Sequence, residues 1–286
     1  MDTHHKENYQ TSRIGFNELD KLELEHDKLN ELEIFHNNRT YFMKINLEKE
    51  SDKLVIFSNG AIDPKKNIPP IYMRSSWANE INASTIFLDD PTLLGTDMRL
   101  GWGQGEYGDF ALESISQILN KILERFNIEY KNTYFYGSSA GGYMSMYYTL
   151  LLPGTKAIVN NPQTNVLSYT PSYVKRMLRH SYKINEINEV PEELMYKLNL
   201  VKAIQHYDVI PDEIYYIQNY CCESDMELHL TPFINDLNKS NINMSNILLL
   251  NYFHKGLGHN PLPKKITIKY INQIINNKLE LNFIKN

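Results

Sequence analysis

The chain has 286 residues, of which 42% are hydrophobic, and it carries a formal net charge of −5 at pH 7. That hydrophobic fraction allows a sizeable core and excludes a globally disordered protein. The mildly acidic balance is not that of a nucleic-acid-binding protein, whose basic residues concentrate on one face, so we expect no nucleic-acid partner.

The first residues are polar and lack the apolar core of a signal peptide. No stretch approaches the roughly 20 uninterrupted apolar residues of a membrane span, so we expect no transmembrane segment. The two cysteines, Cys221 and Cys222, are adjacent, and neighbours of this kind rarely form a structural disulfide. They also lack the C-x-x-C spacing of a zinc site, and we expect no metal. These features together predict a cytoplasmic location.

Residues 1–34 are rich in charge and carry leucines at roughly helical spacing. These leucines are Leu19, Leu22, Leu29 and Leu32. The pattern predicts a charged N-terminal arm or surface helix, with an interaction segment as the alternative. Residues 35–286 are expected to form one further domain, because no repeat or low-complexity linker interrupts them.

Apolar runs alternate with helical periodicity through this second part of the chain. We predict strands over residues 40–47, 53–60, 84–91, 133–137, 156–162, 213–219 and 245–253, and helices over 112–126, 140–152 and 264–277. Such alternation is typical of an α/β fold with a mostly parallel central sheet and helices on both faces. Residues 167–209 break the rhythm with helical segments alone, and we interpret them as a helical cap insertion.

Residues 137–141 read GSSAG and match the G-x-S-x-G motif between a predicted strand and a predicted helix. A sharp strand-to-helix turn strains its central residue, and glycine at 137 and 141 relieves the crowding. The turn lifts the Ser139 hydroxyl out at the carboxyl end of the sheet, above a helix N-terminus with partial positive charge. Ser138 occupies the x position of the motif, so its side chain is expected to point away.

An oxyanion formed at Ser139 needs backbone N–H donors close by. The amide of Ala140, directly after the serine, is the expected first donor. The second is expected from the loop FSNGAIDP at residues 57–64, from the amide of Gly60 or Ala61. An ordinary turn is the alternative role for that loop.

A serine nucleophile needs a base and an orienting carboxylate, in the chain order Ser, acid, His. His259 lies between the last predicted strand and the last predicted helix, in a loop containing glycines, and is the expected base. His254 is the alternative. Asp225 follows the strand at 213–219 and is the expected acid, with Glu223 as its main rival.

With these motifs the chain resembles the α/β-hydrolase superfamily from about residue 40 to its C-terminus. The segments FYGSSAGGYMS, AIVNNPQTN, CCESDMELH and GLGHN are similar to those of bacterial carbohydrate O-acetyltransferases from capsule synthesis and the related enzyme of accessory secretion systems. The resemblance implies Ser139 as acyl carrier, with Asp225 and His259 completing the triad. It also implies acetyl-CoA as the acyl donor, with no tightly bound cofactor.

Planar cations and aromatic rings recur in the loops that follow the predicted strands. Arg74, Trp77, Arg99 and Trp102 would suit the ring faces and hydroxyls of a sugar or the anionic oxygens of a phosphosugar. The alternative is that these aromatic residues are packing anchors. Three residues, Asn161, Pro162 and Gln163, follow a strand at the same end of the sheet and are expected to line the pocket.

We therefore expect serine-dependent acyl transfer, specifically O-acetylation of a bacterial surface carbohydrate or its precursor. A carboxylesterase is the alternative enzyme, and the two outcomes differ in whether the cap excludes water from the acyl-serine. A non-catalytic scaffold with the same fold is the alternative of another class. The expected partner is a small-molecule or carbohydrate substrate, and a homo-oligomer or a biosynthetic complex stays open.

Overall fold

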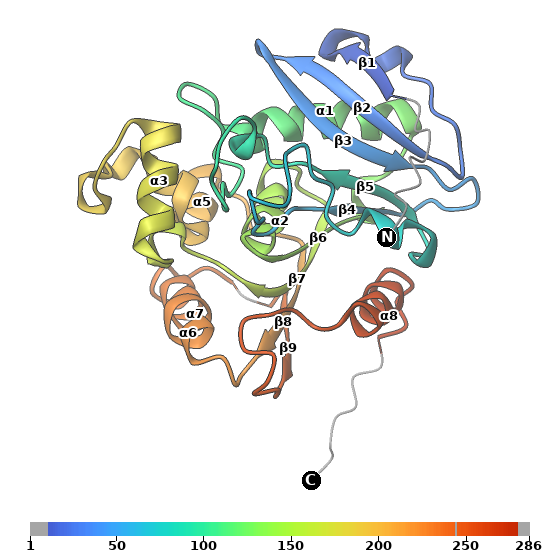
Figure 1. Cartoon of the computed structure of the whole chain (residues 1–286). Coiled ribbons are helices and arrows are strands. Elements are labelled where there is room, and N and C mark those ends of the chain that lie inside the picture. Colours follow the sequence, from blue (N-terminus) through green and yellow to red (C-terminus); the bar gives the residue numbers. More distant parts are fainter. Residues whose placement is uncertain (1–10, 244, 280–286) are drawn as a thin grey trace.

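The computed structural model describes residues 11–243 and 245–279 of the chain. Within these residues, nine strands form one sheet in the order β1-β2-β3-β5-β4-β6-β7-β8-β9 (Figure 1). The strands are β1 (Thr11–Gly15), β2 (Leu29–His36), β3 (Arg39–Asn46), β4 (Leu54–Phe57), β5 (Ser84–Leu88), β6 (Thr133–Ser139), β7 (Lys156–Pro162), β8 (Glu213–Asn219) and β9 (Ile247–Tyr252). The β2–β3 and β3–β5 pairs are antiparallel, and all other neighbours are parallel. The predicted strands are all present in this mostly parallel sheet.

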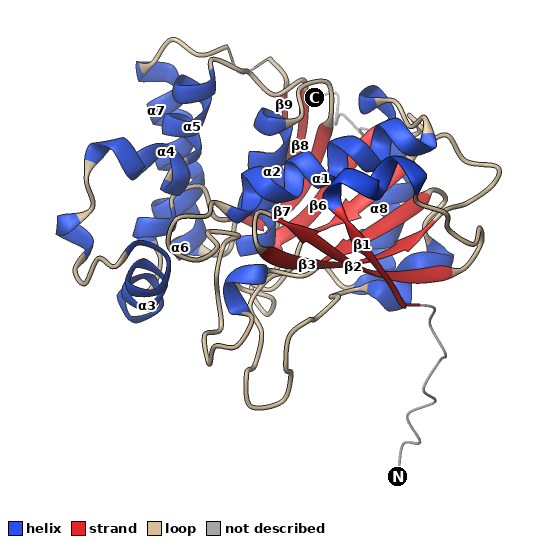
Figure 2. Cartoon of the chain, turned by 90° about the horizontal axis from the view of Figure 1, so that it is seen from above, coloured by secondary structure: helices blue, strands red, loops and turns tan. Residues whose placement is uncertain are grey.

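The helices cover both faces of the sheet. They are α1 (Ala111–Phe126), α2 (Ala140–Leu151), α3 (Pro171–Tyr182), α4 (Met195–Leu198), α5 (Leu200–Tyr207), α6 (Glu223–Asp225), α7 (Thr231–Lys239) and α8 (Lys264–Ile275). Short 3₁₀ turns include η1 (Phe16–Lys21) and η2 (Ser75–Glu80), both before α1, and η5 (Val166–Ser168) between α2 and α3. A π-helical turn spans Met226–Leu230. Figure 2 shows α3 to α7 gathered at one end of the molecule, away from β1–β3.

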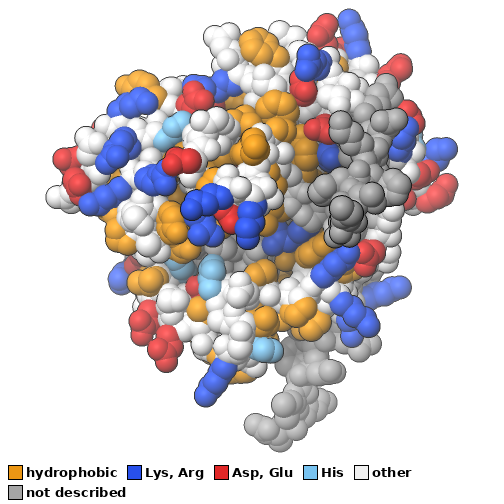
Figure 3. Space-filling model, in the orientation of Figure 1, with side chains coloured by type: hydrophobic (Ala, Val, Ile, Leu, Met, Phe, Trp, Pro, Cys, Tyr) orange, Lys and Arg blue, Asp and Glu red, His pale blue; other side chains and the backbone are white. Residues whose placement is uncertain are grey.

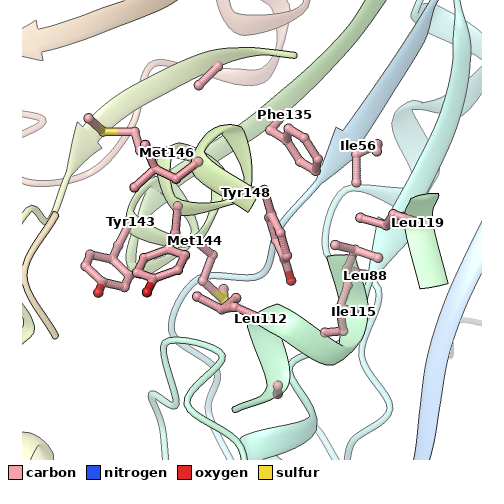
Figure 4. Close-up of a cluster of buried hydrophobic side chains, with 14 of the residues drawn as sticks. Ile56, Leu88, Leu112, Ile115, Leu119, Phe135, Tyr143, Met144, Met146 and Tyr148 are labelled. Carbon is pink, nitrogen blue, oxygen red and sulfur yellow. The ribbon is translucent and has the colours of Figure 1, made fainter. Parts of the chain in front are cut away.

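One face of the sheet packs against α1 and α2. Helix α1 is strongly amphipathic, and its apolar stripe includes Leu112, Ile115 and Leu119, all buried. Figure 4 shows these side chains in one buried cluster with the sheet residue Phe135, whose ring stacks on that of Tyr148 of α2 with the ring centroids 5.0 Å apart. Helix α2 is buried along almost its whole length, which explains why its sequence is apolar on every side.

The opposite face packs against α8, which Figure 1 shows on the other side of the strands from α2. Ile271 and Ile275 of α8 are fully buried in a cluster that includes Phe57 and Tyr136. The two layers hold the carboxyl ends of β4, β6, β7 and β8 side by side, because these four strands are parallel neighbours. Loops leaving them therefore meet at one edge of the sheet.

The N-terminal region differs from the expected charged arm or helix. Residues 1–10 lie outside the described residues, but residues 11–15 and 29–36 are strands of the sheet, and the proposed boundary after residue 34 falls within β2. Leu19 lies in a 3₁₀ turn and Leu32 in a strand, and both are fully buried. Their spacing looked helical only because two different elements were read as one.

Residues between β7 and β8 contain helices but no strand, as expected for residues 167–209. Helix α5 packs against α2, and the N-terminal part of α3 approaches the loop after β5, where Arg99 lies 6.0 Å from the Tyr173 ring. No described helix has the length and apolar character to cross a bilayer.

Candidate active site

Ser139 lies at the junction of β6 and α2, in the sharp turn that its motif predicted. Its backbone has φ 55° and ψ −123°, a conformation that a non-glycine residue adopts only when its surroundings hold it there. A Cβ atom at Gly137 would lie 2.1 Å from the carbonyl oxygen of Gly141, so only glycine fits at that position. Ala140 is the first residue of α2, and its N–H therefore has no partner within the helix.

Three side chains from distant parts of the chain meet at this turn. His259 Nε2 lies 2.8 Å from Ser139 Oγ, and His259 Nδ1 lies 2.7 Å from Asp225 Oδ1. Asp225 is buried, whereas 35% of the His259 side chain is exposed. A carboxylate beside Nδ1 favours the tautomer with the proton on Nδ1, which leaves Nε2 free to accept the hydroxyl proton of Ser139.

The geometry separates these residues from their rivals in the sequence. The His254 side chain is exposed, and its Nδ1 accepts a hydrogen bond from the N–H of Leu257 at 3.1 Å, so it serves a turn of its own loop. Glu223 is exposed at the start of α6, while Asp225 is turned inward. Ser138 is buried, and its Oγ accepts a hydrogen bond from Arg74 Nη2 at 2.8 Å.

The loop that carries His259 is held by a buried asparagine at the end of β8. Asn219 Nδ2 donates to the carbonyl oxygens of His254 and Gly258, both at 2.9 Å. Its Oδ1 accepts from the N–H of His254 at 3.0 Å and from the N–H of Cys221 at 3.2 Å. One fully buried side chain thus fixes both the start and the end of the turn before the histidine.

A second buried asparagine, Asn161 at the end of β7, reaches the same loop. Its Nδ2 donates to the carbonyl oxygens of His259 and Asn260, both at 3.2 Å, and its Oδ1 accepts from the N–H of Asn219 at 2.8 Å. The sequence placed Asn161 at this edge only as a pocket residue, and Asn219 was missed. The signal was an asparagine at the carboxyl end of each of two adjacent parallel strands.

On the opposite side of Ser139 lies the loop after β4, which carries the two amides expected as the second oxyanion donor. Gly60 is buried, and its N–H points to the Met73 sulfur at 3.1 Å, a weak acceptor. Ala61 is exposed. The Met73 amide is itself anchored, because it donates to Asn59 Oδ1 at 3.0 Å.

A buried carboxyl group supports this loop from below. Asp89 Oδ1 accepts from the N–H of Ile71 at 2.8 Å and lies 3.5 Å from Asn59 Nδ2. Burial raises the pKa of Asp89 to about 7, although the Ile71 hydrogen bond favours the charged form.

A second buried titratable group, His229, lies near Asp225. Burial lowers the pKa of His229 to about 4, so this histidine is neutral at pH 7.

Two of the expected substrate-binding residues, Arg74 and Trp77, lie together beside the serine turn. The Arg74 guanidinium lies 5.5 Å from the Trp77 ring and 5.3 Å from the Tyr136 ring. Its Nη1 is buried and has no hydrogen-bond partner among the described atoms. Arg99 is exposed in the loop after β5, where its Nε donates to the Ile62 carbonyl at 3.2 Å.

The other two expected substrate-binding residues have no exposed surface. Trp102 and Gln163 are both fully buried, and the indole N–H donates to Gln163 Oε1. The Trp102 ring also packs edge-on against Tyr169 at 5.8 Å. These two side chains connect the loop after β5 to the loop after β7, so they serve as packing anchors. Because both are fully buried, neither presents a surface to a sugar. The expectation of direct substrate contact is therefore wrong for this pair in the structure described.

No protein-family model matches the chain, and no curated protein is similar to it in sequence. Solved structures do match. The capsule O-acetyltransferase of Neisseria meningitidis serogroup A aligns with a TM-score of 0.61 at 19% identity, covering 85% of this chain and 96% of that one. Carboxyl esterase 2 of Tuber melanosporum aligns with a TM-score of 0.58 at 15% identity, covering 88% and 86%. An esterase/lipase from an uncultured bacterium aligns at 0.54 and 14%, covering 92% and 89%.

These likenesses show that the chain has an α/β-hydrolase fold, as its sequence predicted. These neighbours are an O-acetyltransferase and two esterases. At identities of 14–19% the likeness shows the fold, and the activity of this chain depends on the site itself.

Proposed function

We propose that this protein transfers an acyl group through an acyl-serine intermediate on Ser139 and delivers it to a carbohydrate hydroxyl. The observation that carries the proposal is the pair of contacts of His259, at 2.8 Å to Ser139 Oγ and 2.7 Å to Asp225 Oδ1. A base aligned between a nucleophile and a carboxylate is the arrangement that activates a serine hydroxyl.

In the first half-reaction, Ser139 Oγ attacks the carbonyl carbon of the donor while His259 Nε2 takes the hydroxyl proton. Asp225 stabilises the resulting imidazolium. The oxyanion would accept from the Ala140 amide and, by displacing the Met73 sulfur, from the Gly60 amide. When the intermediate collapses, the donor's leaving group departs with the proton from His259, and Ser139 retains the acyl group as an ester.

In the second half-reaction, His259 removes a proton from the acceptor hydroxyl, whose oxygen attacks the acyl carbon. Ser139 then regains its proton from the imidazolium. Water in place of the sugar would give hydrolysis, so the outcome depends on how well the segment between β7 and β8 excludes water.

Acetyl-CoA is the proposed donor. The neighbouring capsule O-acetyltransferase has been solved in complex with CoA. Figures 1 and 3 share one orientation, and the loops after β4 and β5 lie on the face that both show. Lys and Arg side chains gather near the middle of this face in Figure 3. Exposed Lys65, Lys66 and Arg99 belong to those loops. Cations at the mouth of a site attract an anionic donor or a phosphorylated sugar.

The test combines acetyl-CoA with capsule-type oligosaccharides and follows both thiol release and the mass of the sugar. Acetylated sugar is expected from the wild type, and Ser139→Ala should lose it. Ser138→Ala is the matched control, because it removes the neighbouring hydroxyl, whose hydrogen bond is with Arg74, and keeps the Ser139 hydroxyl that contacts His259. A fluorophosphonate should label the wild type and Ser138→Ala but not Ser139→Ala.

Other outcomes of this test would favour an esterase or a non-catalytic scaffold. Thiol release without acetylated sugar, together with turnover of an aryl acetate, would make the protein an esterase. Wild-type protein that neither turns over nor takes the fluorophosphonate label would make it a scaffold and refute the proposal.

A further inference from the structure

Cys222 lies beside the acid and the base of the proposed triad. Its Sγ, a carboxylate oxygen of Asp225 and a ring nitrogen of His259 all lie within 4.8 Å of one another. Cys222 lies directly before α6, three residues before Asp225, and both residues are buried. The adjacent Cys221 does not belong to this group.

A thiolate, a carboxylate and an imidazole are all ligands that bind Zn²⁺, with ligand bonds of about 2.0–2.3 Å in tetrahedral geometry. Those bond lengths place neighbouring ligand atoms about 3.3–3.6 Å apart. The three atoms here lie within 4.8 Å of one another, so side-chain shifts of about 1 Å would bring them to a shared ion.

A second feature of the same site is a buried carboxylate oxygen without a partner. Asp225 Oδ2 has no hydrogen-bond partner among the described residues, and only 5% of that side chain is exposed. The other carboxylate oxygen, Oδ1, contacts His259. A buried carboxylate oxygen without a partner is costly, and a cation would satisfy it.

We propose that Cys222, Asp225 and His259 form a Zn²⁺ site whose occupation switches off the proposed acyl-transfer activity. His259 Nδ1, which faces Asp225, would bind the ion, and water would complete the tetrahedron. The imidazole proton then moves from Nδ1 to Nε2, and the Cys222 thiol releases its proton to solvent. With a proton on Nε2, His259 cannot accept the hydroxyl proton of Ser139, so the nucleophile is not activated.

The inhibitory consequence depends on the proposed function, but the binding site itself does not. Binding is therefore measured first, on untagged Ser139→Ala protein, by competition with a chromophoric zinc chelator. This variant keeps all three ligands and has no nucleophile. We expect Zn²⁺ to bind there and Cys222→Ser in the same background to weaken that binding at least tenfold.

Cys221→Ser is the matched control and should bind Zn²⁺ as tightly as its parent. The comparison between the two serine variants is needed because histidine is a common zinc ligand and the chain has eight other histidines. Equal affinity of Cys222→Ser and Cys221→Ser, or no binding by either, would overturn the site.

Inhibition is then read as the rate of fluorophosphonate labelling of the wild type with and without Zn²⁺. Labelling should slow at least tenfold in Zn²⁺ and recover when EDTA is added, whereas Cys222→Ser should label at the same rate in both. Zinc that binds through Cys222 without slowing the labelling would refute the switch while leaving the binding site intact. Wild-type protein that is never labelled would refute the proposed function, and the chelator competition would still decide the zinc site.

Discussion

Ser139 and His259 lie 2.8 Å apart, yet the chain holds them in place by two different means. The serine turn is held by close backbone contact within the motif, since a Cβ at Gly137 would lie 2.1 Å from the carbonyl oxygen of Gly141. The histidine loop is determined by side chains from other strands, because Asn161 and Asn219 bind its backbone from the ends of β7 and β8.

This difference teaches that one half of the site is a local backbone structure and the other half is a tertiary assembly. A local structure built on close backbone contact has no intermediate state, so a small substitution should disrupt it completely. An assembly of separate hydrogen bonds should weaken in steps, as partners are removed one at a time.

The largest effect is expected from substituting Ser139 or His259, because the two residues act together in the reaction. Ser139→Ala and His259→Ala should each lower kcat/KM for thioester cleavage by about a thousandfold or more. The double variant should be no worse than either single one, because neither residue acts without the other. Steady-state thiol release measures this, with thermal unfolding to show that all three variants fold. Effects that multiply would mean that the two residues act independently.

The next effect is on the serine turn alone. In Gly137→Ala the new Cβ would meet the Gly141 carbonyl oxygen at 2.1 Å, so the backbone must move. We expect the free energy of unfolding to fall by about 3 kcal/mol, together with loss of activity. Urea unfolding measures it. Gly15→Ala is the control, since its Cβ would meet only the Glu18 side chain, at 3.1 Å. Equal stability of the two variants would contradict the account of the turn.

The histidine loop should respond less severely. Asn219→Ala removes the four hydrogen bonds that Asn219 makes to the backbone of the loop and of Cys221, and we expect it to lower the free energy of unfolding by about 2 kcal/mol. Activity should fall by about 10–100-fold, through a misplaced imidazole. Exposed Asn251 on β9 offers the control Asn251→Ala, which should change neither quantity. Full activity in Asn219→Ala would show that other contacts hold the loop.

The same contrast explains what could be predicted from the sequence. The serine turn was predictable because its glycines and its strand and helix are contiguous. The candidates for the acid and the base followed from chain order, but choosing Asp225 over Glu223 depends on burial, which a loop sequence does not specify. The role of Asn219 was missed, because asparagines at the ends of two adjacent strands mark this edge of the sheet but do not identify the backbone groups that they bind.

Two further errors have physical causes. In β2 the buried residues Asn30, Leu32 and Ile34 alternate with exposed or partly exposed ones, which is a strand pattern that the charged residues obscured. Trp102 was expected to bind a sugar because it lies in a glycine-rich loop, but that loop folds inward and buries it. Residue type at a loop does not determine which way the loop turns.

The loop after β4 can be compared with the histidine loop in a further way. The carboxyl group of Asp89 supports the loop after β4, whereas the side-chain amides of Asn161 and Asn219 support the histidine loop. The pKa of Asp89 rises from 3.8 to about 7 on folding. Between these values the folded state binds a proton that the unfolded state does not. The free energy of unfolding should therefore fall as pH rises, by at most about 1.4 kcal/mol per pH unit. An amide has no such dependence.

Asp89→Asn keeps an oxygen for the Ile71 N–H and removes the titration. Its stability relative to the wild type should therefore increase between pH 4.5 and 7, by about 1 kcal/mol per pH unit, and then level off. Urea unfolding at several pH values measures this difference, in which contributions common to both proteins, such as that of His229, cancel. Asn219→Ala should instead show a deficit independent of pH. A constant difference for Asp89→Asn would mean that Asp89 is already ionised in the folded protein at low pH, and the two loops would then be supported alike.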